Sequence, residues 1–426
     1  MTFITRLLNR YKENKRFRQV VSLFGVNVIV IPLSFVSNII ITRFLGPVGF
    51  GDFKFLLYVI NYSIILFNFG FFQAGNRAIV LSNDEKKTRE YYGSMVVMLS
   101  AMFAVITIML IAYAFLDENV NTKGLRSMLI FIIPFTWIFL FVNFFEVLFQ
   151  ADNKIGLLAK SRLYPKIAFF ATVLLLYFLL FEFDGNKLKL IWVLFLGSHF
   201  VSFIPVMYKV NPSFKNIGTR LKEIWFYNKA YGFNVYFGAL FSLGFTALSG
   251  LLISYFGIDN SGVGYYSLAL TIAEPLGFIP NVIATTHYKD FSTNKSIPRR
   301  LILITAAVVC VALLMTWLLV GPFIRFFYGM EFNPVITLTY IVSIGVILNG
   351  FADFFNRFLG SHGQGKALRN SAIIVGFCIL VFNLTLIPEL GEKGAALTLI
   401  LSSLIYVLNM LWFYRKLILK LAKNPV

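Results

Sequence analysis

Charged and reactive side chains are scarce in this sequence of 426 residues. Asp, Glu, Lys and Arg together make up only 13% of it, and hydrophobic types make up 58%. A soluble domain carries about 25% charged residues, so the composition excludes both a soluble globular protein and a disordered chain. The two cysteines, Cys310 and Cys378, lie in apolar runs and the three histidines are scattered. Neither a disulfide framework nor a metal site is therefore expected.

Nucleotide-binding motifs are also missing. No GxxxxGK[ST] loop occurs, and the glycine-rich segment Gly46–Gly51 lacks the GxGxxG spacing and any strand–helix–strand context. We therefore expect no organic cofactor. The 38 Lys and Arg residues outnumber the 19 Asp and Glu residues, which gives a formal net charge of +19. In a soluble protein that excess would suggest nucleic acid, so its distribution along the chain has to be considered first.

Apolar runs of about 20 residues recur along the chain, and each is long enough to cross a membrane as a helix. They predict an all-α integral membrane protein with twelve transmembrane helices, at 20–42, 53–76, 92–116, 127–150, 163–183, 188–208, 232–256, 264–288, 301–321, 334–358, 368–388 and 394–414. The first run is expected to be a span and not a cleaved signal, because it is long and no small-residue cleavage site follows it.

The basic residues test this count, because cytoplasmic loops carry most of the Lys and Arg. With the N-terminus inside, 30 of the 38 fall in inside segments and eight in outside loops. Both termini are therefore predicted to be cytoplasmic. Most of the positive charge is an orientation signal, and no nucleic-acid partner is expected.

The loops divide the chain into two predicted lobes. An amphipathic segment at 1–19 precedes an N-lobe at 20–208, and a cytoplasmic linker at 209–231 leads to a C-lobe at 232–414 and a basic tail at 415–426. Glycine turns near 43–53 and 255–266, and loops near 149–156 and 359–366, repeat at an offset of about 210 residues. This repetition predicts two pseudo-symmetric six-helix lobes of the same orientation, with a cleft between them.

Several motifs resemble a known family across nearly the whole chain. They are the segments Ile41–Phe53, Phe69–Arg77, Leu148–Lys154, Gly262–Ala269 and Leu386–Ala396, the last with its Ile-Pro…Gly…Gly-Ala-Ala pattern before the final span. Together they resemble the polysaccharide-exporter branch of the multidrug/oligosaccharidyl-lipid/polysaccharide flippase superfamily. Twelve spans resemble its O-antigen flippases better than its fourteen-span lipid II flippases.

The resemblance implies an alternating-access transporter of the bacterial cytoplasmic membrane. The implied cargo is an undecaprenyl-pyrophosphate-linked oligosaccharide, an O-antigen or other polysaccharide repeat unit, moved from the inner to the outer leaflet. The resemblance also implies coupling to a proton or sodium gradient, and polysaccharide polymerase and chain-length machinery as partners. The glycan itself does not follow from it.

A diphosphate cargo needs polar, cationic groups at membrane depth, where ionisable residues are costly unless they face a cavity or a partner. Arg77 ends the second span, and its guanidinium could grip a phosphate with two hydrogen bonds. Asn68, Gln73 and Asn76 precede it as a polar stripe, and Arg43 is the matching candidate near the outer side. The alternatives are a positive-inside anchor for Arg77 and a solvated loop charge for Arg43.

Three residues are candidates for ion coupling. Glu274 lies near mid-membrane in the eighth span, directly before Pro275, and could carry a proton or hold a cation. Glu146 lies in an inner stripe of the fourth span, and His199 lies midway along the sixth. The alternative roles are a neutral, hydrogen-bonded Glu274 and a packed, neutral His199.

Asp353 and Arg357 are four residues apart on the tenth span and so share a helix face. We expect either a structural ion pair near the inner end of the span or a gate between the lobes.

Two other functions remain open. An ion-coupled drug antiporter of the related multidrug branch would share the twelve-span plan. A membrane polysaccharide polymerase or ligase would need large outer loops, and the predicted outer loops are short. We therefore expect a transporter and not an enzyme.

Overall fold

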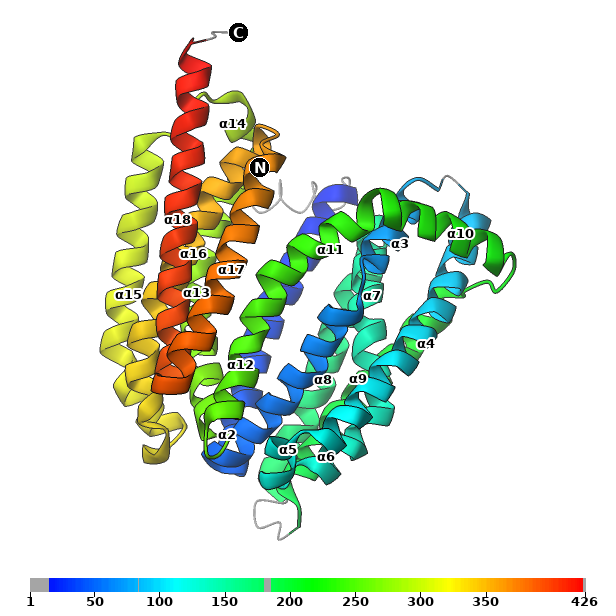
Figure 1. Ribbon diagram of the computed structural model, residues 1–426, viewed down its shortest axis with the longest axis vertical. Coiled ribbons are helices and arrows are strands. Elements are labelled where there is room, and N and C mark those ends of the chain that lie inside the picture. Colours follow the sequence, from blue (N-terminus) through cyan, green and yellow to red (C-terminus); the bar gives the residue numbers. More distant parts are fainter. Residues whose placement is uncertain (1–14, 83, 180–184, 424–426) are drawn as a thin grey trace, which may run out of the picture. The chain divides into compact units, whose positions relative to one another are not determined.

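The structure is a computed structural model that describes residues 15–82, 84–179 and 185–423. Most of the predicted amphipathic segment, residues 1–14, and the last three residues of the predicted tail lie outside the described residues. Every regular element in the described part is a helix, and none is a strand. This confirms the all-α membrane fold (Figure 1).

The helices follow one another with short connections. In chain order they are α2 (Lys15–Phe67), α3 (Phe71–Val80), α4 (Glu85–Leu116), α5 (Glu118–Thr122), α6 (Arg126–Ile132), η1 (Ile133–Phe135), α7 (Trp137–Ala151), α8 (Ile155–Leu179), α9 (Lys187–Val210), α10 (Ile217–Tyr227), η2 (Asn228–Gly232), α11 (Phe233–Ala239), η3 (Leu240–Gly244), α12 (Phe245–Phe256), α13 (Ser261–Thr286), α14 (Tyr288–Thr293), α15 (Arg299–Phe327), η4 (Met330–Phe332), α16 (Pro334–Ser361), α17 (Gly365–Leu390) and α18 (Glu392–Lys423).

Nine helices of the described chain are long and apolar enough to cross a membrane, and the bent pair α6/η1 and α7 makes a tenth. The pair bends by 45° next to Pro134, whose ring removes a helix hydrogen bond. Helix α2 contains the first predicted span and most of the second, separated by a kink at Gly46. The seventh predicted span is divided among η2, α11, η3 and α12, and its apolar helix is too short to count alone. The count is consistent with twelve spans.

The kink in α2 depends on one glycine. Gly46 has a φ of 69° and a ψ of 178°, which an L side chain adopts only with strain. The helix resumes at once and continues to Phe67. The chain therefore passes the kink without a loop, and the residues that follow Gly46 are already helical.

The second predicted span is broken between α2 and α3. Phe69 and Gly70 both have positive φ, and the Asn68 side chain accepts a hydrogen bond from the Phe72 amide at 3.3 Å. Two side chains, one from η2 in the predicted linker and one from α11 in the seventh predicted span, bind the backbone oxygens that the break sets free. Asn228 donates to Phe69 O at 3.1 Å, and Tyr236 donates to Leu66 O at 2.6 Å.

The chain forms two compact units. Unit 1 comprises residues 1–45 and 66–237, and unit 2 comprises residues 46–65 and 238–426. In unit 1, α8 packs along α9, and α3 contacts α7 and α10. In unit 2, α16 packs against both α13 and α18, and α17 packs against α18 and α12. The lobe boundaries expected from the loops stay a prediction.

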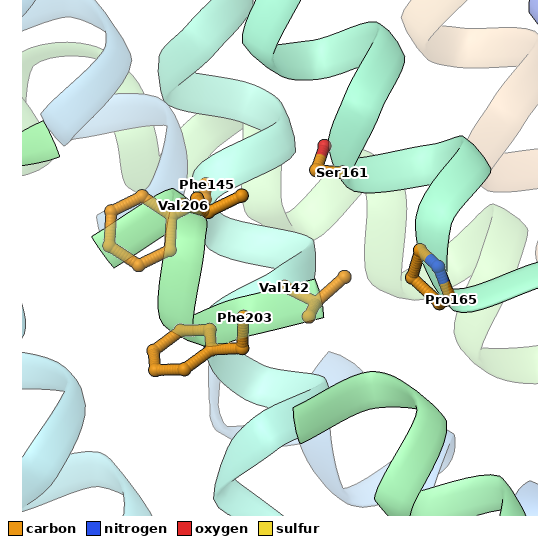
Figure 2. A pocket seen from close by; sticks show the side chains of 6 residues that line it. All are labelled: Val142, Phe145, Ser161, Pro165, Phe203 and Val206. Carbon is orange, nitrogen blue, oxygen red and sulfur yellow. The ribbon is translucent and has the colours of Figure 1, made fainter. Parts of the chain in front are cut away.

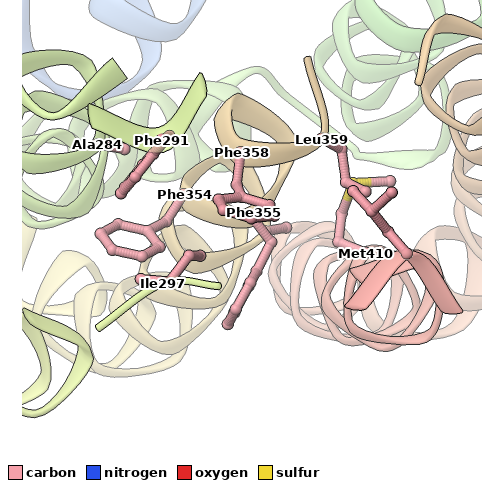
Figure 3. Close-up of a cluster of buried hydrophobic side chains, with 10 residues drawn as sticks. Ala284, Phe291, Ile297, Phe354, Phe355, Phe358, Leu359 and Met410 are labelled. Atoms are coloured by element: carbon pink, nitrogen blue, oxygen red, sulfur yellow. The ribbon is translucent and has the colours of Figure 1, made fainter. Parts of the chain in front are cut away.

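An aromatic core joins α13, α14, α16 and α18 within unit 2. Phe291, Phe354 and Phe358 are each 1% exposed or less, and their rings pack edge to face at centroid distances of 5.6 to 5.8 Å (Figure 3). Burial of such rings stabilises a helix bundle by close packing, which in lipid replaces the hydrophobic effect between helices. This core packs the C-terminal ends of α13 and α16 against α14 and α18.

Candidate functional site

The most conspicuous charges inside a span lie in unit 2, on α2 and α13. Lys54 is half-buried on α2, and Glu274 is exposed on α13, directly before Pro275. Glu274 lies within electrostatic range of Lys54. The ammonium group also stands 5.1 Å from the centroid of the Phe50 ring. Ionisable groups in a span are rare and costly, so an acid and a base within electrostatic range of each other there indicate a functional site.

Close contacts fix the part of α2 that follows the kink and precedes Lys54. Asn260 donates to the Asp52 carboxylate at 2.7 Å and accepts from Ser254 at 2.6 Å. Gly51 lies so close to Asn260 that a Cβ on Gly51 would stand 1.7 Å from the Asn260 backbone oxygen. Backbone against backbone is the tightest contact two helices make, so α2 has no freedom to shift at this point.

Polar side chains extend from this contact toward Glu274. Tyr58 lies one turn beyond Lys54 and is in hydrogen-bonding contact with Ser267, which precedes Glu274 by two turns on α13. Tyr266 is in similar contact with Ser249 of α12, which donates to Asn383 of α17 at 3.1 Å. We call Lys54, Tyr58, Ser267 and Glu274 the Lys54–Glu274 cluster.

Lys54 was not among the residues selected from the sequence. Lys54 falls at the start of the predicted second span, 53–76, but was counted among the eight basic residues of the outside loops, because turns and spans were separated by composition alone. In the structure only Gly46 leaves the helical conformation, and Lys54 lies about two turns into the second half of α2. The helical phase of Gly51, Lys54 and Tyr58 could have revealed it.

Glu146 has a direct partner in unit 1. Its carboxylate accepts from Arg162 of α8 at 3.0 Å, and Lys166 lies one turn further along α8 within electrostatic range. His199 on α9 is buried, and its Nδ1 lies 2.8 Å from Phe195 O. The Phe139 and Phe195 rings pack on the imidazole at centroid distances of 5.3 and 4.6 Å. Ion-coupling roles for Glu146 and His199 stay predictions.

A small apolar cavity lies next to this ion pair. It is lined by Val142, Phe145, Ser161, Pro165, Phe203 and Val206 and has a volume of about 10 Å³ (Figure 2). That volume holds about one water molecule and excludes a phosphate or a sugar. This cavity is therefore too small to bind such groups.

The predicted stripe along the second span has mixed surroundings. Asn76 donates to Val147 O of α7 at 3.0 Å, and Asn68 caps α3. The Gln73 Oε1 atom is buried and has no hydrogen-bond partner among the described residues. Arg77 is exposed, and its guanidinium makes no hydrogen bond or ion pair within the described chain. Arg43 is exposed on α2. Cargo binding by these residues stays a prediction.

The expected ion pair between Asp353 and Arg357 is replaced by other contacts in unit 2. Asp353 accepts from Tyr406 of α18 at 3.0 Å, and Asn356 donates to the same hydroxyl at 2.7 Å. Arg357 reaches Asn281 of α13 at 3.4 Å. The two charges remain within electrostatic range of each other. Their role as a gate stays a prediction.

An ion network ties the linker helix α10 to the start of α4 in unit 1. Arg220 bonds to Glu90 at 2.9 Å and to Glu223 at 2.7 Å, and Tyr91 donates to Glu223. Burial of Glu223 opposes ionisation, but the hydrogen bonds from Tyr91 and Arg220 outweigh burial and lower the pKa of its carboxyl below the ordinary 4.5. The described residues contain no group of three or more His, Cys, Asp or Glu that could hold a metal ion.

A family comparison identifies the chain. The model of the family described as polysaccharide biosynthesis protein matches residues 17–288, which is more than half of the chain. The chain belongs to this polysaccharide biosynthesis family. The match includes Lys54, Arg77 and Glu146, and it extends past Glu274.

The chain is similar to several known proteins over nearly their whole length. It is 22% identical to the capsular polysaccharide biosynthesis protein CapF of Staphylococcus aureus over 414 residues, which is 93% of this chain and 98% of that protein. Its fold is similar to an inward closed lipid II flippase MurJ, with a TM-score of 0.72, 14% identity and coverage of 94% and 90%. An inward-facing multidrug resistance MATE transporter gives a TM-score of 0.66, 14% identity and coverage of 96% and 100%. The chain therefore has the fold of a multi-pass membrane transporter.

Proposed function

We propose that the protein is a flippase that moves an undecaprenyl-pyrophosphate-linked oligosaccharide from the inner to the outer leaflet of the bacterial cytoplasmic membrane. The observation that carries the proposal is the Lys54–Glu274 cluster, an acid and a base within membrane spans of a polysaccharide biosynthesis family member. A lipid-linked sugar diphosphate is a cargo that needs such groups. Its lipid tail stays in the bilayer, while its charged head has to cross hydrocarbon.

The cluster suggests how transport and an ion gradient could be linked. The Lys54 ammonium can attract a diphosphate, and Glu274 can exchange a proton or a sodium ion when its attraction to Lys54 weakens. We assign ion coupling to Glu274. We also propose that the two units provide alternating access. Both termini would be cytoplasmic, as the positive-inside pattern predicts, and a polysaccharide polymerase with its chain-length machinery would receive the product.

The relatives support this cargo class. One carries a name from capsular polysaccharide biosynthesis, and the MurJ fold belongs to a lipid II flippase. The MATE fold favours a second candidate function, ion-coupled export of small organic molecules. Both functions use the same architecture, so the cargo has to be tested directly.

The decisive experiment removes the protein from its host. The deletion strain should accumulate the polyprenyl-linked repeat unit on the cytoplasmic leaflet and lose the surface glycan. Unchanged surface glycan without accumulation contradicts the flippase proposal. Purified protein in vesicles should move the lipid-linked oligosaccharide without altering it chemically, which separates translocation from polymerisation or ligation. Transport of organic cations in place of the lipid would favour the antiporter.

A further inference from the structure

A polar crevice opens in unit 1 where the start of α4 meets the connection between α7 and α8. Its volume is about 260 Å³, and hydroxyl and charged side chains line it, among them Ser82, Glu85, Thr88, Arg89, Asp152 and Lys154. Small-molecule sites begin at roughly 300 Å³, so the crevice suits a small polar group. None of the predicted site residues is part of it.

Hydrogen bonds fix the wall formed by Asp152. The Asp152 carboxylate pairs with Lys154 at 2.6 Å and accepts from Tyr92 at 3.1 Å. The Lys154 ammonium also stands 5.2 Å from the centroid of the Tyr92 ring. The three side chains hold one another, so this wall is organised before any ligand binds.

The α4 wall is fixed from behind. Arg89 donates through Nε to Asn211 O at 2.9 Å, and its backbone oxygen accepts from Ser213 at 2.9 Å. The next residue, Glu90, is held by Arg220 of the linker helix. The α4 start therefore cannot turn away from the crevice without breaking the linker network.

Two charged groups of the crevice remain available to a ligand. The Glu85 carboxylate has no hydrogen-bond or ion-pair partner in the described part of the chain. Arg89 uses only Nε, which leaves its two terminal nitrogens as donors. The crevice disfavours another anion, because three carboxylates line it and only two cations do. The carboxylates are those of Asp84, Glu85 and Asp152, and the cations are Arg89 and Lys154. Carboxylate acceptors beside guanidinium donors suit a neutral ligand rich in hydroxyl groups, such as a sugar.

The crevice begins close to Arg77, the residue predicted to bind the diphosphate. Ser82 follows Arg77 by five residues, two of them past the end of α3 at Val80, and the amides of Leu81 and Ser82 still bond back to Arg77 O and Ile79 O, so Ser82 lies roughly 7 Å further along the axis of α3. A sugar joined to a diphosphate at Arg77 would therefore reach the crevice. We propose that the polar crevice binds the sugar head of the lipid-linked cargo and so selects the glycan. This assignment rests on the proposed flippase function and gives it a specificity site.

The test compares two lipids that share the diphosphate and differ in the sugar. Wild-type protein in nanodiscs is titrated with undecaprenyl diphosphate and with the same lipid carrying the repeat unit purified from the host strain. Glu85→Gln removes the negative charge and turns one of the two acceptor oxygens into an NH2 donor, without breaking any side-chain hydrogen bond or ion pair of the described chain. Glu118→Gln is the matched control, because Glu118 also follows an Asp N-cap at a helix start but lies outside the crevice.

The wild type and Glu118→Gln should bind the sugar-bearing lipid more tightly than the bare lipid, and Glu85→Gln should reduce that preference about tenfold. An unchanged preference in Glu85→Gln overturns the sugar site, and so does an equal weakening of both lipids. A wild type that binds both lipids equally also overturns it but leaves the flippase function standing. A wild type that binds neither lipid contradicts both proposals.

Discussion

Substitution of Gly51 by alanine tests the close contact between α2 and Asn260, three residues before Lys54. The new Cβ would stand 1.7 Å from the Asn260 backbone oxygen and 2.4 Å from its carbonyl carbon, whereas real Cβ contacts below 3.0 Å are essentially never seen. The two backbones must therefore separate by more than 1 Å. A shift of that size also lengthens the 2.7 Å bond between Asn260 and Asp52 beyond hydrogen-bonding distance.

The expected cost combines these two effects. Overpacking of a tight contact costs about 1 to 3 kcal/mol, and loss of one hydrogen bond costs about 1 kcal/mol more. We expect Gly51→Ala to lower the free energy of unfolding by about 2 to 4 kcal/mol. Export should also fall, because Lys54 follows Gly51 on the same helix and moves away from Glu274.

Reversible unfolding in mixed detergent and SDS micelles measures this cost. Gly197→Ala is the matched control, because Gly197 is exposed inside α9 and a Cβ there meets nothing within 4 Å. That control should be neutral or more stable by up to about 1 kcal/mol, the helix-propensity difference between glycine and alanine. Equal unfolding midpoints for the two variants would refute the close contact between α2 and Asn260.

Three further predictions concern charged and titratable groups. Lys54→Glu should abolish export, and the double exchange Lys54→Glu with Glu274→Lys should restore a measurable part of it, because the pair stays opposite in charge; a double variant no better than the single one would contradict the pairing. Because the pKa of Glu223 is lowered in the folded state, its contribution is complete above pH 4.5 and disappears as the pH falls through the lowered pKa; melting temperatures between pH 7 and pH 3 should drop less steeply in Glu223→Gln than in the wild type. His199→Phe should keep export and its pH profile, because Phe139 and Phe195 enclose the ring; a changed profile would assign His199 a proton-transfer role.

The helices could be predicted from the sequence because each has a long apolar run, and lipid leaves the backbone few alternatives. The repeated motifs led in the same way to the polysaccharide family, which the family match confirms. Helix interruptions were harder to foresee. The sequence pattern predicted a turn over residues 43–52, between the first two spans, whereas in the structure only Gly46 leaves the helical conformation.

Partners of the charged residues could not be predicted, because helical periodicity indicates the face of a residue and not the neighbouring helix. Asp353 and Arg357 share a face as expected, but Tyr406 and Asn281 from other helices bind them. The pairing of Glu146 with Arg162 likewise depends on how α7 meets α8. Lys54 was missed because the turn near Gly46 was predicted to be longer than it is, and because the neighbouring helix α13 could not be predicted.

The course of the chain between the two units has a consequence for dividing the protein. The chain passes from one unit to the other at 45/46, at 65/66 and at 237/238, and each passage lies near a helix irregularity: Gly46, the break at 68–70, and the π-helical turns η2 and η3. A cut in the linker would therefore not yield two independent halves. The N-terminal fragment would retain residues 46–65, which the C-terminal fragment needs to complete its own unit. Separately expressed fragments should each be incomplete, and only coexpression, with insertion of that helix into the other fragment, should restore the fold.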